Sequence, residues 1–341
     1  MRALPLLLLL ALPTLARADD LDAAAVEARV RQVARDLAPL VVEVEALGGL
    51  DERFDAPETE EEAREGILTK AGFKQAHGPT TGVILSSDGL IATTTFALHR
   101  EPRHLIVTLH DGRSFVARLL GRDEARALVI LKIDAKDLPV PRAAPPAEVV
   151  PGRFAVALGR GLGGRSPGVS LGIVSAVGRV GGRALQSSAA ISPANYGGPL
   201  AGLDGSVLGL LVPLALDGGM ASVDLYDSGI GFALPLADVL AIAPRLARGE
   251  VLRPGVLGVS PDLTAKDGVR LASVAAGSPA AAAGLREGDL LLTIDGEPVT
   301  TPWELRRALA RRHAGDEVTL EVRRGAEART VKARLAAKEG E

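Results

Sequence analysis

The sequence predicts a mainly β protein, with two small β-barrels followed by a smaller α+β unit. Two successive blocks of about six short apolar runs, over 82–133 and 153–234, are separated by turn signals that mark strand ends. Five prolines between residues 139 and 151 divide the blocks. A third set of strands, interrupted by two short helices, follows residue 253. Two blocks of short strands joined by a proline-rich bridge are typical of paired β-barrels.

Residues 1–18 have the features of a secretory signal peptide. Arg2 precedes a short apolar run, and Ala16 and Ala18 fit the small residues of a cleavage site. The apolar run is too short to span a bilayer as a helix. The chain has no cysteine, which excludes disulfides and thiolate chemistry. We therefore expect an exported protein, in a periplasm or secreted.

A helix is predicted over 19–39, because Asp20 can cap its start, apolar residues recur at helical spacing and Pro39 ends it. Residues 51–65 then carry eight acidic and two basic side chains. Such a charge run indicates a solvated loop, whose role stays open.

The two barrels are predicted over 40–135 and 152–235, within a domain spanning 40–235. Aspartate–glycine pairs at 88–89, 111–112 and 204–205 lie between apolar runs and indicate hairpin turns. The expected strands of the two barrels are 82–86, 90–95, 104–109, 115–121, 127–133, 153–158, 169–178, 183–188, 198–203, 206–213 and 229–234.

A linker helix is predicted in 236–252, and the third unit in 253–336. Its expected strands are 256–260, 269–274, 289–294, 317–323 and 329–335. Thr301, Pro302 and Glu304 predict a helix start, with threonine as N-cap and glutamate closing a capping box.

The net charge of −3 gives no basic excess that would favour nucleic acid or an anionic membrane. The histidines do not cluster with carboxylates at ligand spacing, so we expect no metal and no cofactor. The 47% hydrophobic composition allows a well-buried core.

Residues 192–200 carry the most informative motif of the chain, Ser-Pro-Ala-Asn-Tyr-Gly-Gly-Pro-Leu. Together with the runs 81–93, 172–176 and 229–235, it resembles the HtrA/Deg family of trypsin-like serine proteases. The resemblance covers nearly the whole chain after the signal peptide and implies a two-barrel trypsin-like (chymotrypsin-fold) domain. In that family the loop holds a nucleophilic serine, at the position of Tyr196 here.

Two further positions depart from the family pattern. By the same resemblance, Phe96 occupies the place of the catalytic histidine and Ala127 that of the aspartate. A serine protease needs a hydroxyl, an imidazole and a carboxylate in these roles. Ala194 replaces a family glycine in the oxyanion loop beside Asn195, and alanine resists backbone angles that glycine tolerates. We therefore expect a degenerate triad and oxyanion loop, and a chain that is not an enzyme.

The third unit resembles a PDZ domain of the HtrA type. Its matching residues include Gly255, Val256, Leu257, Gly258 and Val259. In such domains this loop offers N–H groups to a peptide's terminal carboxylate, and the peptide adds as a strand. The resemblance thus implies a peptide-binding site at 255–259.

The resulting interpretation is an exported HtrA-like pseudoprotease that binds polypeptides or protein C-termini as a scaffold, regulator or holding chaperone. Association with further copies or with active HtrA relatives stays open. One alternative is a serine endopeptidase-like hydrolase with noncanonical catalytic residues. Another is a purely structural envelope protein that leaves its PDZ groove unused.

Overall fold

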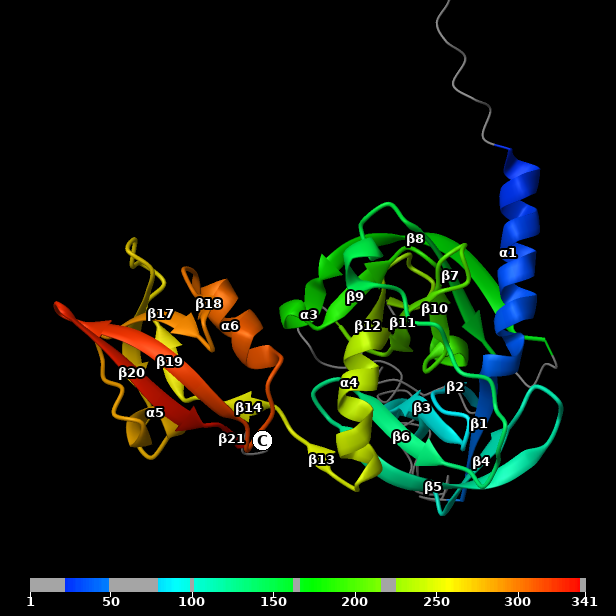
Figure 1. The fold of residues 1–341 in the computed structure, drawn as a ribbon, viewed down its shortest axis with the longest axis horizontal. Coiled ribbons are helices and arrows are strands. Elements are labelled where there is room, and N and C mark those ends of the chain that lie inside the picture. The colour runs from blue at the N-terminus through cyan, green and yellow to red at the C-terminus, as the bar shows by residue number, and fades with distance from the viewer. Residues whose placement is uncertain (1–21, 49–78, 99–100, 162–165, 216–224, 338–341) are drawn as a thin grey trace, which may run out of the picture.

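The structure, a computed structural model, describes residues 22–48, 79–98, 101–161, 166–215 and 225–337. It confirms the predicted fold class, with two β-barrels followed by a separate α+β domain (Figure 1). The predicted signal peptide at 1–18 and the acidic run at 51–65 lie outside the described residues.

The first helix, α1, spans Ala23–Leu37 and continues into a 3-10 turn at Ala38–Leu40. Its N-cap is Asp22, whose Oδ1 accepts hydrogen bonds from the N–H groups of Ala24 and Ala25 at 3.1 and 3.2 Å. The expected cap was Asp20, so the helix begins later than the predicted residue 19. The cap therefore differs by two residues and the helix start by four, and assigned helix ends commonly vary by one or two residues.

The first barrel contains six antiparallel strands, and a pairing between β5 and β6 closes it. Its apolar core is formed by alternate inward side chains such as Val42, Ile91 and Leu131. The strands are β1 (Val41–Leu47), β2 (Thr80–Ile84), β3 (Leu90–Thr94), β4 (His104–Thr108), β5 (Ser114–Asp123) and β6 (Leu128–Lys132), with a 3-10 turn at Thr95–Leu98.

The second barrel is also closed and six-stranded, in the order β10-β11-β12-β9-β8-β7. Its strands are β7 (Phe154–Gly159), β8 (Gly168–Gly178), β9 (Ala184–Ser187), β10 (Pro199–Ala201), β11 (Val207–Val212) and β12 (Gly231–Pro235). Short helical turns lie at Pro146–Glu148, Arg179–Gly182 (α3) and Pro193–Asn195.

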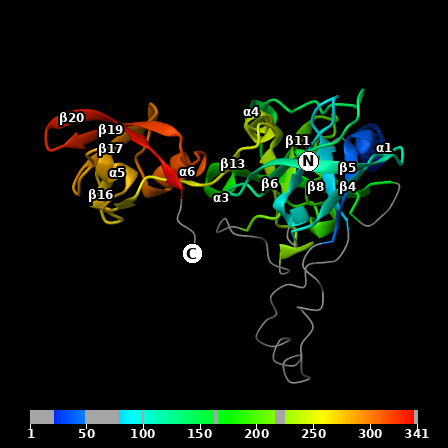
Figure 2. The ribbon, with the colours of Figure 1, turned by 90° about the horizontal axis from the view of Figure 1, so that it is seen from below.

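The connection to the last domain is helix α4 (Leu236–Ala247) followed by a short strand, β13 (Val251–Leu252). We expected a linker helix up to 252, but β13 pairs in parallel with β5 of the first barrel. The connection therefore returns to the first barrel before the chain leaves for the third domain. In Figures 1 and 2, α4 lies against the barrels, and the chain crosses to the C-terminal domain after β13.

The C-terminal domain is a sheet in the order β15-β16-β17-β19-β20, with its own apolar core. The expected capping box of α6 is present, because Thr301 and Glu304 bond each other's backbone. The elements are β14 (Gly255–Val256), β15 (Val259–Pro261), β16 (Val269–Val274), α5 (Pro279–Ala282), β17 (Leu290–Ile294), β18 (Glu297–Pro298), α6 (Pro302–Ala310), β19 (Glu317–Arg324), β20 (Glu327–Arg334) and β21 (Ala336–Ala337).

Candidate functional sites in the barrels and the C-terminal domain

The fold brings Phe96, Ala127 and Tyr196 together from three separate segments. Phe96 lies in the 3-10 turn after β3, and Ala127 lies in the turn before β6. The two turns are joined, because the N–H of Thr95 donates to the carbonyl of Ala127 at 3.0 Å. Tyr196 follows the 3-10 turn of the second barrel. Phe96 and Ala127 thus lie in adjoining turns of the first barrel, and Tyr196 contacts Phe96 from the second barrel.

The rings of Phe96 and Tyr196 pack edge to face, with centroids 5.4 Å apart and planes 68° apart. The ring of Tyr226 lies 6.2 Å from that of Tyr196 on another side, again edge to face. Tyr196 is 2% exposed and Phe96 8%. Such contacts contribute about 0.5–1.5 kcal/mol beyond the burial of the rings. The tyrosine is therefore part of the packed core between the barrels.

Burial of Tyr196 changes its acid–base behaviour. Desolvation, and then the nearby Tyr226 and Asp227, raise the pKa of the Tyr196 phenol well above its usual value near 10. Burial also raises the pKa of Tyr226 to about 12. Both phenols are therefore protonated at neutral pH, and a neutral phenol is a weak nucleophile.

The loop before Tyr196 is held in a 3-10 turn by its own side chains. Asn195 Oδ1 accepts from the N–H of Ser192 at 2.9 Å, and Asn195 Nδ2 donates to the carbonyl of Ala190 at 3.2 Å. The N–H of Asn195 donates to the carbonyl of Ser192 at 3.0 Å. Ala194 has no positive φ, so the backbone strain expected from its replacement of glycine does not arise.

The first barrel fixes this loop through its second strand. Thr81 Oγ1 donates to the carbonyl of Ala194 at 2.8 Å, and the N–H of Thr81 donates to the carbonyl of Tyr196 at 3.1 Å. Gly197 has φ +85°, and a Cβ placed there would lie 2.1 Å from the carbonyl oxygen of Thr81. Only glycine fits such a close approach at this backbone angle.

The predicted peptide site, residues 255–259, contains one pair of residues in β14 and three residues that lead into β15. Gly255 and Val256 form β14, which pairs with β21, and the side chain of Leu257 is buried in the domain core. Gly258 has φ +81°, and a Cβ placed there would lie 2.3 Å from Cβ of Ser278. Val259 begins β15. Of the five residues, only 257–259 therefore lie outside the β14–β21 pair.

Strand β15 is an edge strand, paired only with β16 among the described strands. The carbonyls of Leu257 and Gly258 accept from the N–H groups of Ala280 and Ala275, each at 2.9 Å. Within the described residues the N–H groups of Leu257 and Gly258 donate to no acceptor. Two free donors beside an open strand edge form a surface on which an extended peptide can pair as an additional strand.

Sequence reasoning missed a buried charge cluster that joins the first barrel to the C-terminal domain. Asp123 Oδ2 lies 2.8 Å from Arg126 Nη1 and 2.9 Å from His313 Nε2, and its side chain is fully buried. Arg126 Nη2 also donates to the carbonyl of Arg311 at 3.0 Å. A carboxylate at the end of a strand, next to a turn, is usually solvated, but the Asp123 side chain is fully buried. No local signal reveals it, because its partner lies 190 residues away.

Two findings concern cofactors and membranes. No group of three or more histidine, cysteine or acidic side chains that could hold a metal ion occurs within the described ranges. None of the helices described here has the length and hydropathy needed to cross a bilayer.

Comparison with known proteins identifies both domains. Residues 80–210 match the trypsin-like peptidase domain, and residues 255–335 match the PDZ domain. The putative serine protease HhoA of Synechocystis is 30% identical over 278 residues, which is 73% of this chain and 68% of that protein. A probable periplasmic serine endoprotease, DegP-like, of Halomonas elongata is 31% identical over 74% of this chain and 55% of its own length. HhoB of Synechocystis, a putative serine protease, is 31% identical over 64% of its length. The chain thus spans roughly half to two thirds of these relatives.

Solved structures agree with this result. The HtrA-type protease AlgW, determined with a decapeptide, has a TM-score of 0.67 at 25% identity and covers 92% of this chain and 99% of its own. The serine endoprotease from Yersinia pestis has a TM-score of 0.63 at 27% identity and covers 91% and 98%. The two-barrel domain and the PDZ domain therefore occur together in the same order.

The comparisons contradict the expectation that the chain is not an enzyme, because the relatives that match most of it are named serine proteases and endoproteases. The expectation was wrong because three side chains can exclude one catalytic mechanism but not every kind of catalysis. The side chains of Phe96, Ala127 and Tyr196 rule out only the Ser-His-Asp mechanism. Proteases without a triad member still retain catalysis roughly 10³–10⁴-fold over water from substrate binding and oxyanion donors. Absent triad side chains therefore do not exclude hydrolysis.

Sequence identity over both domains, the shared domain order and the shared fold lead to one assignment. The chain belongs to the HtrA family of trypsin-like serine proteases with a C-terminal PDZ domain.

Proposed function

We propose that this protein is an exported HtrA-family protein that binds polypeptides by their free C-termini through its PDZ domain. The observation that carries the proposal is the open edge of β15 next to the N–H groups of Leu257 and Gly258, which have no acceptor in the described part of the chain. A peptide carboxylate accepts charge-assisted hydrogen bonds from such donors, and the residues before it pair with the strand edge.

Export to the periplasm is part of the proposal. Residues 1–18 have the pattern of a signal peptide, and several relatives are named probable periplasmic endoproteases. Capture of C-termini in that compartment suits a holding chaperone, a scaffold or a regulator that associates with its own copies or with active relatives. Light scattering of a thermally unfolding client distinguishes the first role, since only a holding chaperone suppresses aggregation at stoichiometric amounts.

The test of C-terminus recognition compares one neutral apolar peptide in its free-acid and amidated forms, with calorimetry on the full chain. The free acid should bind at least tenfold more tightly, because hydrogen bonds to a charged acceptor are about twice as strong. Equal affinities would contradict the proposal.

A matched pair of glycine variants locates the site. Gly258→Ala places a Cβ 2.3 Å from Ser278 and should abolish the preference for the acid form. Gly277→Ala is the control, because Gly277 also has positive φ but open space around it. Loss of the preference in the control alone would place carboxylate capture elsewhere.

The second candidate function is peptide hydrolysis by groups other than Phe96, Ala127 and Tyr196. Family membership favours it, since the relatives are named serine proteases. If it holds, degradation of unfolded casein should be unchanged in Tyr196→Phe, which keeps the ring and removes only the hydroxyl. Loss of turnover in that variant would instead assign the reaction to the tyrosine.

A further inference from the structure

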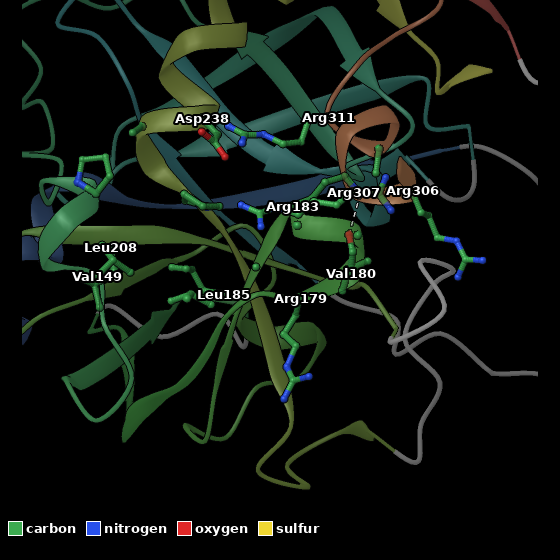
Figure 3. A pocket seen from close by; sticks show the side chains of 18 of the residues that line it. Val149, Arg179, Val180, Arg183, Leu185, Leu208, Asp238, Arg306, Arg307 and Arg311 are labelled. Atoms are coloured by element: carbon green, nitrogen blue, oxygen red, sulfur yellow. Dashed lines mark hydrogen bonds between the residues drawn. The ribbon is translucent and has the colours of Figure 1, made fainter. Parts of the chain in front are cut away.

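A cavity of about 740 Å³ lies between the second barrel and the PDZ domain (Figure 3). Its walls come from α3, the start of α4, and one face of α6. The volume is in the range of sites that bind small ligands or short chain segments. The cavity is separate from the edge of β15 and from the packed rings of Phe96 and Tyr196, none of which line it.

Arginine dominates the charged lining of this cavity. The protein as a whole carries a net charge of −3, yet Asp238 is the only carboxylate in the lining. The lining arginines are Arg179, Arg183, Arg306, Arg307 and Arg311. Five positive side chains against one negative side chain leave a strong local excess of positive charge.

None of these arginines forms an ion pair with a carboxylate among the described residues. Arg183 Nε donates to the carbonyl of Val180 at 3.1 Å, and Arg307 lies 5.5 Å from the ring centroid of Trp303. Burial, and then the charge of Arg126, lower the pKa of Arg183 and outweigh the opposite effect of the Asp123 charge. Elsewhere in the PDZ domain arginines do pair, as Arg324 does with Asp289 at 2.7 Å. Within the described residues, the arginines of the cavity therefore lack the carboxylate ion pairs that arginines form elsewhere in the domain.

The walls of the cavity are close-packed against each other at one end. A Cβ placed at Gly182 would lie 2.7 Å from Cγ of Arg307, and one at Gly181 would lie 2.9 Å from Cβ of Ala310. The turn α3 therefore contacts α6 directly and fixes the arginines of both elements relative to each other. Figure 3 shows Arg311 reaching toward α4, which carries Asp238.

We propose that this cavity binds an extended acidic segment of a polypeptide. The charge of the cavity indicates that carboxylates of the segment are the groups bound, since guanidinium groups bind carboxylates in a bidentate manner. Arg307 lies in α6 and Arg311 caps its C-terminal end, so the two residues are about 6 Å apart along the helix axis. Alternate side chains of an extended chain are about 6.6 Å apart, so carboxylates at every second residue match the two arginines. The intervening apolar side chains face Val149, Leu185 and Leu208.

This inference rests on the proposed binding of polypeptides, but it uses a different site. The probe is therefore a fluorescein-labelled, C-terminally amidated peptide with aspartate and valine in alternation, which offers no terminal carboxylate to β15. The matched peptide has asparagine in place of aspartate. Fluorescence anisotropy on the full chain at low salt should give at least tenfold tighter binding of the aspartate peptide.

Variants that remove positive charge from the cavity, and one that removes its negative charge, locate the binding site. The double variant Arg307→Gln with Arg311→Gln should weaken binding roughly three- to tenfold, because two ion pairs are lost. Arg286→Gln with Arg323→Gln, on exposed residues outside the cavity, should leave it within twofold. Asp238→Asn should tighten binding about twofold or more, and a gain cannot arise from misfolding.

Three results would overturn the inference: equal binding of the asparagine peptide, no effect of the Arg307 and Arg311 double variant, or displacement by pyrophosphate at equal concentration. Displacement by pyrophosphate would assign the cavity to a small phosphate compound, because pyrophosphate carries two phosphoryl groups joined by one bridging oxygen. If the amidated acidic peptide fails while neutral free-acid peptides bind, only this inference falls. If the reverse holds, C-terminus recognition falls and the arginine cavity stands.

Discussion

Replacing Asp123 by asparagine should lower the free energy of unfolding by about 3–5 kcal/mol. The carboxylate is fully buried and contacts Arg126 and His313, whose side chains are 8% and 3% exposed. Burial by itself would raise the pKa of Asp123, but hydrogen bonds and charges from His313 and Arg126 outweigh it and hold that pKa below its usual value. The asparagine variant keeps the shape but leaves Arg126 buried without its counter-charge.

The magnitude follows from the difference between buried and exposed ion pairs. Removing one partner of a buried pair costs several kcal/mol, because an uncompensated charge remains in the interior. Asp111 supplies the matched control, since it pairs with Arg113 at 2.8 Å while both side chains are more than half exposed. Asp111→Asn should cost at most about 1 kcal/mol.

The assay is urea unfolding followed by the fluorescence of Trp303. This is the only tryptophan of the chain, and it lines the cavity at the domain boundary. Circular dichroism in the far ultraviolet gives the loss of the strands in the same samples. If Asp123→Asn costs no more than Asp111→Asn, the buried cluster does not stabilise the junction between the first barrel and the PDZ domain, and the reasoning is refuted.

Other predictions concern the packing between the barrels and the PDZ core. Tyr196→Ala should cost about 3–5 kcal/mol in urea unfolding, because a buried aromatic ring is removed, and a loss below about 1 kcal/mol would contradict the described packing. Gly197→Ala should cost about 2–4 kcal/mol, since its Cβ would approach the carbonyl of Thr81 at positive φ; an unchanged unfolding midpoint would show that the loop lies elsewhere. The hydrogen bond from Arg324, which outweighs burial, lowers the pKa of Asp289. A lowered carboxyl pKa stabilises the fold above the unfolded value near 3.9, and this contribution is lost as pH falls through the folded pKa. Asp289→Asn should therefore flatten the acid loss of stability below about pH 4, and an unaltered slope would assign that loss to other carboxyls.

The elements that local pattern determines were predictable from sequence. The capping box of Thr301 and Glu304 depends on residues three positions apart, and the turn at Asp204 and Gly205 on neighbours. The meeting of Phe96 with Tyr196 depends on residues 100 positions apart. Only the resemblance to a known family related these two positions, because it placed them where the catalytic histidine and serine lie, and periodicity gives no such long-range relation.

Features built across domains were not predictable in this way. Asp123 is the last residue of β5 and precedes a turn, a position that usually places a carboxylate in water, but His313 and Arg126 cover it. The arginine cavity likewise combines α3 with α6, and its arginines look like ordinary solvated charges in the sequence. The inference that the chain is not an enzyme failed for a related reason, because three positions describe one mechanism and not every reaction that a protease scaffold supports.

The most direct test of the central claim is the backbone amide NMR spectrum of the full chain with a peptide ending in a free carboxylate. The account predicts large shifts of the Leu257, Gly258 and Val259 amides, together with protection of the β15 amides from solvent exchange, and neither change with the amidated peptide. Shifts of equal size with both peptides, or shifts confined to residues outside 257–261, would contradict C-terminus recognition by this strand.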